Sequence, residues 1–138
     1  MSKFTEGGLR YQEFIDGFVK LARSDTGANR IRQNGHAERV NDDDLPLTPE
    51  EAERKALLLS LKDHDRELIA QMLEDCRRSA IHDVLADLQW SYSCGGLELT
   101  SAGHRFPIDP FWGEMHADFV CRLEGDEWLA ETLQGDGQ

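Results

Sequence analysis

The sequence has no long apolar run, few cysteines and no short catalytic motif, and each absence excludes a class of protein. No apolar stretch approaches the roughly 18 residues that suggest a membrane span. The first residues, Met1–Glu6, lack the apolar region of a secretion signal. We therefore expect no membrane partner and a cytoplasmic location. The length of 138 residues fits one domain over 1–138, with a polar frayed tail at 134–138.

The three cysteines, Cys76, Cys94 and Cys121, form no C-x-x-C pair and are too sparse for a disulfide framework. We expect buried or partly buried thiols. Gly-rich phosphate loops, G-x-S-x-G and H-E-x-x-H are all absent, which removes the enzyme families that are easiest to recognise. A non-enzyme is favoured, and no cofactor is expected unless a divalent metal binds.

Charge is strongly negative and uneven, with a formal net charge of −12. Residues 1–41 hold seven Lys/Arg against five Asp/Glu, whereas residues 42–138 hold eight against 22. Such a body repels nucleic acid and anionic membranes but complements a basic protein partner. A nucleic-acid mimic is a variant of that idea, and it requires carboxylates in regular rows with about the spacing of phosphates.

Helical periodicity dominates the first two thirds of the chain. Residues 7–23 predict an amphipathic helix, with Asp16 and Lys20 spaced for an ion pair on its polar side. Thr48-Pro49-Glu50-Glu51 is a capping box that predicts a helix to about residue 60. A third helix is expected over 63–91 and ends at a Gly-Gly pair; its apolar face is predicted to be Leu68, Ile69, Met72, Leu73, Cys76, Ala80, Val84 and Leu88.

Residues 24–47 interrupt this periodicity and predict a long loop, mobile or partner-binding. After the third helix, residues 97–100 and 116–123 alternate apolar and polar side chains, which indicates strands, and residues 101–104 predict a turn. The expected fold is α+β and mainly α: three helices packed together, followed by a short antiparallel β-hairpin.

Histidines near carboxylates are the candidate metal ligands. His116 and Asp118 would share one face of the expected strand, with His104 across the turn. His82 and Asp83 lie near a second carboxylate on the third helix. Each group has a plainer interpretation as an exposed polar face or as a hydrogen-bonded edge of the core.

Two groups are candidate partner-binding residues. Arg30 and Arg32 lie in the 24–47 segment, and Phe111, Trp112 and Trp128 lie in or beside a proline-rich loop. Aromatic residues on loops either plug a core or anchor a partner, and both alternatives stay open.

Three stretches resemble a family of small bacterial proteins of unknown function. They are Arg66–Leu73, Ala80–Ala86 and His116–Gly125, and the likeness covers roughly residues 48–130. The resemblance implies a single domain but no activity or ligand.

Two hypotheses about function remain. The favoured one is a small, acidic, non-enzymatic protein-binding module of the inhibitor, immunity or adaptor type. A homodimer is also possible, because the leucine-rich helix 49–61 carries more apolar surface than one small domain can cover. The alternative is a protein that binds a metal or small ligand through His and Asp residues.

Overall fold

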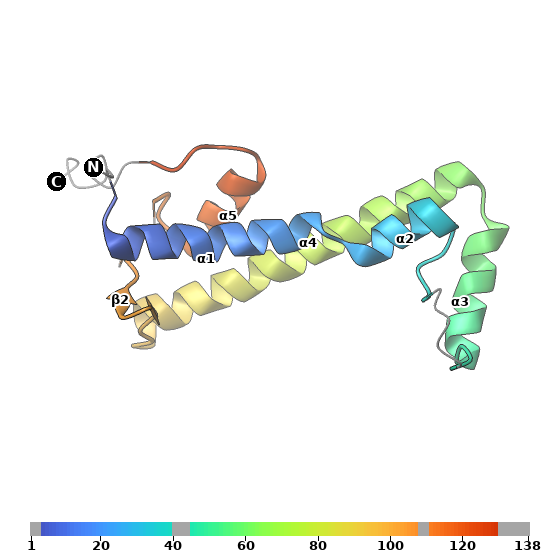
Figure 1. Ribbon diagram of the computed structural model, residues 1–138, viewed down its shortest axis with the longest axis horizontal. Coiled ribbons are helices and arrows are strands. Elements are labelled where there is room, and N and C mark those ends of the chain that lie inside the picture. The colour runs from blue at the N-terminus through green and yellow to red at the C-terminus, as the bar shows by residue number, and fades with distance from the viewer. Residues whose placement is uncertain (1–3, 40–44, 108–110, 130–138) are drawn as a thin grey trace. The chain divides into compact units, whose positions relative to one another are not determined.

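The computed structural model describes residues 4–39, 45–107 and 111–129, and the chain divides into two compact units (Figure 1). Unit 1 takes in Met1–Ala22 and Ser79–Gln138, and unit 2 is Arg23–Arg78. The expectation of one domain over 1–138 stays a prediction, and the tail 134–138 lies outside the described residues.

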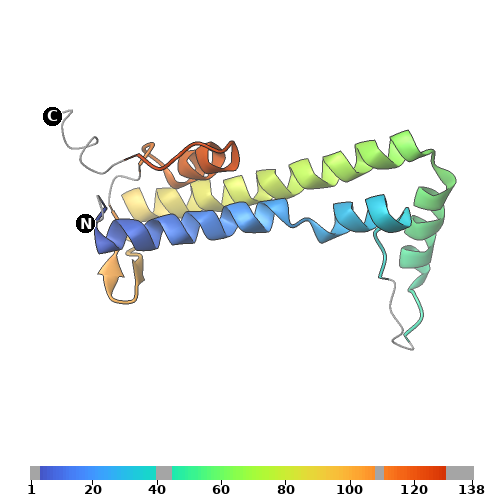
Figure 2. The same ribbon diagram turned by 45° about the horizontal axis from the view of Figure 1, so that its top comes forward.

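Unit 1 contains helix α1 (Glu6–Arg23), the second half of α4 (Asp63–Cys94) and α5 (Met115–Leu123). In both ribbon views α1 runs alongside the C-terminal half of α4 (Figures 1 and 2). Their shared core is a cluster of nine buried residues: Tyr11, Ile15, Val19, Ala22, Leu85, Phe106, Phe111, Met115 and Phe119.

The apolar face predicted for α1 is confirmed. Tyr11, Ile15, Val19 and Ala22 recur every three or four residues and are all buried, and the two phenylalanines on the same face pack partly buried against the cluster. Because four turns of one helix deliver a continuous apolar stripe, α1 supplies nearly half of the core of unit 1.

A two-stranded antiparallel sheet closes over a two-residue turn. Strand β1 (Thr100–Ser101) pairs with β2 (His104–Arg105), and both turn residues, Ala102 and Gly103, have positive φ angles of 51° and 80°. Positive φ at both positions matches the twist of the strands and favours glycine. The predicted turn at 101–104 is therefore confirmed.

The strand expected at 116–123 is wrong, because these residues form α5. Met115 and Phe119 lie one turn apart on α5 and both are buried. A run of nine residues fits helical and alternating patterns almost equally well, and packing against α1 and α4 selects the helix. The fold is mainly helical with a small sheet, but it has more helices than the three expected.

Unit 2 contains α2 (Thr26–Asn34), α3 (Pro49–Ser60) and the first half of α4. Helix α2 corrects the expectation of a loop over 24–47. The Asp25 side chain caps it by accepting a hydrogen bond from the Ala28 amide at 3.1 Å, and Gly35 ends it with a φ of 80°. Aspartate is a common N-cap residue and glycine a common residue at the end of a helix, so the sequence contained both signals for α2.

The core of unit 2 is small. Its buried members are Ala28, Ile31, Leu58 and Ala70. Arg66 reinforces it from α4 by donating to the backbone carbonyl of Leu61 at 2.6 Å, and so satisfies a free carbonyl at the end of α3. In unit 2, hydrogen bonds from a charged side chain thus supplement the stabilisation that comes mainly from apolar burial in unit 1.

The apolar face predicted for α4 is largely wrong. Leu68, Met72 and Val84 are 45%, 64% and 59% exposed. Cys76 and Cys94 are also exposed, and Cys121 is half-buried, so the expectation of buried or partly buried thiols holds only for Cys121. Nearly every side of α4 carries apolar residues, so periodicity alone could not say which side faces a core.

We predict that Thr48→Ala destabilises α3 by about 1 kcal/mol. The Thr48 hydroxyl accepts from the Glu51 amide at 3.2 Å, and the Glu51 carboxylate accepts from the Thr48 amide at 2.9 Å. Amide hydrogen exchange across α3 measures the effect. Thr48→Ser keeps the oxygen and should keep the protection; equal loss in both variants would contradict the capping role.

Candidate functional site

Among the described charged side chains of unit 1, that of Asp118 is the most deeply buried. Its residue is 0% exposed, and it accepts hydrogen bonds from the Tyr11 hydroxyl and from the Trp112 backbone amide, the latter at 2.7 Å. Tyr11 comes from α1, Asp118 from α5 and Trp112 from the segment before α5. The carboxylate therefore ties α1 to the C-terminal part of unit 1, since Tyr11 lies 107 residues before Asp118 and Trp112 six residues before it.

Burial raises the pKa of Asp118 to about 6, although the Tyr11 and Trp112 hydrogen bonds oppose the shift. Burial and the neighbouring Asp118 carboxylate raise the pKa of Tyr11, so its hydroxyl stays protonated and donates. Asp118 therefore has a structural role here, as an acceptor for Tyr11 and Trp112.

The helical course of α5 separates His116 from Asp118, which were expected on one face. Residues i and i+2 point about 200° apart on a helix. His116 instead contacts Glu114, with Nε2 and Oε2 2.6 Å apart, and its ring meets that of His82 edge-on at a centroid distance of 5.1 Å. The structure thus brings together two of the histidines proposed as ligands, but through a contact that the sequence did not indicate.

The remaining members of the proposed metal group stay apart. His104 lies exposed on β2, and the Asp83 carboxylate pairs with the adjacent His82, at 3.3 Å from Nδ1. Residues 4–39, 45–107 and 111–129 contain no group of three His, Cys, Asp or Glu side chains that could hold a metal.

The loop aromatics pack inward. Phe111 is 3% exposed and stacks on Tyr11, which favours the core-plug alternative for Phe111. Trp128 lies 4.9 Å from Phe111 and 5.4 Å from Trp112, centroid to centroid. Its indole N–H donates to Asp16 at 3.2 Å. The interpretation as core plugs accounts for these contacts.

Arg122 completes this corner of unit 1. Its guanidinium donates to both carboxylate oxygens of Asp16, at 2.8 and 3.3 Å, and lies 5.2 Å from the centre of the Trp128 ring. A planar guanidinium suits both contacts. Asp16 and Arg122 are 106 residues apart in the sequence. The i,i+4 spacing, which suggested an ion pair between Asp16 and Lys20, could therefore not indicate Arg122 as the partner.

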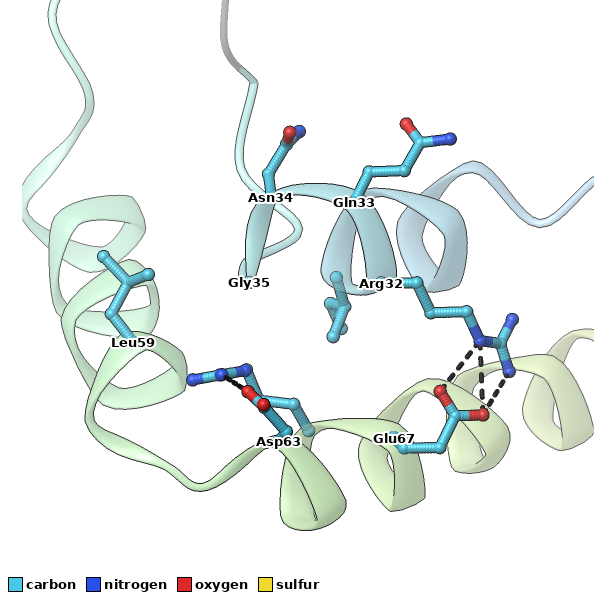
Figure 3. Close-up of a pocket in the computed structure, with 9 residues that line it drawn as sticks. Arg32, Gln33, Asn34, Gly35, Leu59, Asp63 and Glu67 are labelled. Atoms are coloured by element: carbon cyan, nitrogen blue, oxygen red, sulfur yellow. Dashed lines mark hydrogen bonds and ion pairs between the residues drawn. The ribbon is translucent and has the colours of Figure 1, made fainter.

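In unit 2 an open pocket of about 770 Å³ lies among α2, α3 and α4 (Figure 3). Arg32 reaches across it to Glu67, with a shortest contact of 3.0 Å, and also pairs with Glu74, whereas Gln33 and Asn34 project away from this ion pair. Arg30 is exposed on α2. The Arg32 guanidinium is held by two carboxylates, so the pocket offers an anion little free positive charge.

Large exposed hydrophobic residues form a feature that the sequence indicated only in part, at the leucine-rich helix 49–61. Unit 2 exposes more of them than it buries: Leu45 (66%), Leu57 (60%), Leu59 (50%), Leu68 (45%), Met72 (64%) and Leu73 (37%). In unit 1, Trp90 is 70% exposed. Trp90 lies about 140° from Leu85 around the axis of α4. Its exposure could therefore have been predicted if the buried side of the helix had been known.

These features define a mainly helical protein with a small antiparallel sheet and exposed apolar surfaces on α3 and α4. A family model described as "Family of unknown function (DUF6547)" matches residues 6–129, and the chain belongs to that family. This confirms the resemblance to a family of unknown function. Searches of curated proteins and of solved structures returned no match. None of the described helices is long and apolar enough to cross a membrane.

From the raised pKa of Asp118 we predict that its contribution to the stability of the folded protein decreases as pH rises. Between about pH 4 and pH 6 the folded protein holds a proton that the unfolded chain has lost, so the contribution of Asp118 to the free energy of unfolding falls as pH rises. A shift of this size corresponds to about 2–3 kcal/mol. Asp118→Asn removes the titration.

Urea unfolding of both proteins from pH 4 to pH 7 measures this effect. The advantage of the wild type over Asp118→Asn should shrink with rising pH, and taking the difference cancels the other carboxylates. A difference that stays constant over this range would contradict the raised pKa.

Proposed function

We propose that this protein is a non-enzymatic protein-binding module that docks a partner through the apolar surface of unit 2. One observation carries the proposal: unit 2 exposes Leu57 and Met72 by 60% and 64%, while among its described residues the buried core holds only two large aliphatic side chains, Ile31 and Leu58. Large apolar residues that stay exposed in a unit with so small a core are candidates for an interaction site.

Helix α3 shows the imbalance most clearly. Leu58 is the one residue of α3 that is buried among the described residues, whereas Leu57 and Leu59, on either side of it, are at least half exposed. Leu57 lines an open hollow of about 620 Å³ together with Ala56, Arg54 and two glutamates. Burying one leucine against a partner contributes about 1.5–3 kcal/mol, so a few such contacts support specific binding.

Metal or small-ligand binding is the weaker candidate. His82 and His116 are in contact and Glu114 is adjacent, but Asp118 is occupied by Tyr11 and Trp112, and His104 has no described contact with the pair. The proposed ligands therefore do not converge in the part of the chain that the structure describes.

We predict that Leu57→Ser combined with Met72→Ser abolishes partner binding without unfolding the protein. Both side chains are mostly exposed, so the cost in stability should stay within about 0.5 kcal/mol. Quantitative capture from the lysate of the native host at low salt, with the wild type and the variant in parallel, measures the binding.

The matched control is Leu97→Ser with Leu129→Ser, which removes two exposed leucines from unit 1. It should retain the captured protein. Capture by the Leu57/Met72 variant at the wild-type level would refute the proposal. Light scattering at high concentration separates a homodimer from another partner, since a dimer that becomes monomeric in this variant uses the same surface.

A further inference from the structure

The outer face of α4 in unit 1 carries an aromatic residue that its own core does not use. Leu85 is 0% exposed, and Ile81, Leu88 and Tyr92 pack partly buried on the same side of the helix. At 100° per residue Trp90 points roughly 140° away from Leu85. A tryptophan that is 70% exposed on the side opposite the core contributes little to folding.

Two aspartates precede Trp90 on α4. Asp83 and Asp87 lie seven and three residues before it, which places all three side chains on one helical face. Both aspartates are exposed, and the Asp83 side chain is 81% accessible. The face therefore combines a large flat ring with two accessible carboxylates.

The charge of unit 1 reinforces this pattern. Unit 1 holds five Lys/Arg against 14 Asp/Glu, a net charge of −9. Each of its arginines forms an ion pair with a carboxylate: Arg10 with Glu6, Arg105 with Glu98 and Arg122 with Asp16. The arginines of unit 1 thus pair with carboxylates other than Asp83 and Asp87.

We propose that Trp90, Asp83 and Asp87 form a second docking surface, separate from that of unit 2, for a basic amphipathic segment of a protein partner. An apolar side chain of the partner covers the indole ring, and Lys or Arg residues reach the two carboxylates. Arg also stacks on an exposed tryptophan. Charge complementarity selects this occupant: a second copy would bring the same negative face, and anionic lipid or nucleic acid would be repelled.

The probe is a synthetic twelve-residue amphipathic peptide of Leu and Lys that carries a fluorophore, titrated with the full-length protein at low ionic strength. Fluorescence anisotropy gives the affinity, and a blue shift of tryptophan emission that is absent in Trp90→Phe reports burial of Trp90. We expect Trp90→Ala to weaken binding at least about tenfold, as for a central aromatic anchor, and Trp90→Phe to weaken it less. Circular dichroism checks that the variants fold.

Charge-matched variants separate a specific face from general attraction. Asp83→Asn with Asp87→Asn should weaken binding and reduce its salt dependence. Glu124→Gln with Glu127→Gln changes the net charge equally, at exposed positions of the same unit, and should leave the affinity within about twofold.

Several outcomes would overturn the proposal. They are wild-type affinity in Trp90→Ala, equal weakening in both charge-matched pairs, or a dimer that becomes monomeric in Trp90→Ala while the peptide does not bind. The Leu57/Met72 variant should bind the peptide normally. Loss of peptide binding there would transfer the site to unit 2 and leave the proposed function standing.

Discussion

The buried carboxylate of Asp118 is the interaction on which unit 1 depends. Its oxygens take hydrogen bonds from the Tyr11 hydroxyl and the Trp112 amide, so one side chain holds α1, α5 and the segment between the sheet and α5 together. Around it, Tyr11 contacts Phe106, Phe111 and Trp128 through their rings. The cost of burying a carboxylate appears as its raised pKa, and the hydrogen bonds offset part of that cost.

Unit 2 is held together differently. Its few buried apolar residues are supplemented by polar contacts: Arg66 caps α3, Arg32 joins α2 to two glutamates of α4, and Arg54 on α3 pairs with Glu38 at 2.9 Å. Exposed ion pairs stabilise weakly. A unit that buries so little while it exposes leucines on α3 is suited to gaining stability from a partner, which is the physical basis of the proposed function.

Local signals predicted local structure well. The amphipathic stripe of α1, the capping box at Thr48 and the Ala102–Gly103 turn each depend on residues within a few positions of one another. The errors arose where local patterns were ambiguous: His116–Leu123 fitted two periodicities, and the apolar residues of α4 covered most of its circumference. The proposed His116–Asp118 site failed with the strand on which it rested.

By itself the sequence determined the mainly helical character, the start and end of α3, the hairpin turn and the excess of negative charge, because caps, periodicity and composition act over short distances. Only the tertiary structure decided that Asp118 meets Tyr11 across 107 residues, that Phe111 and Trp128 pack inward, and that Trp90 remains exposed. These outcomes depend on which face of a helix finds a neighbour, and a neighbour distant in sequence leaves no local signal.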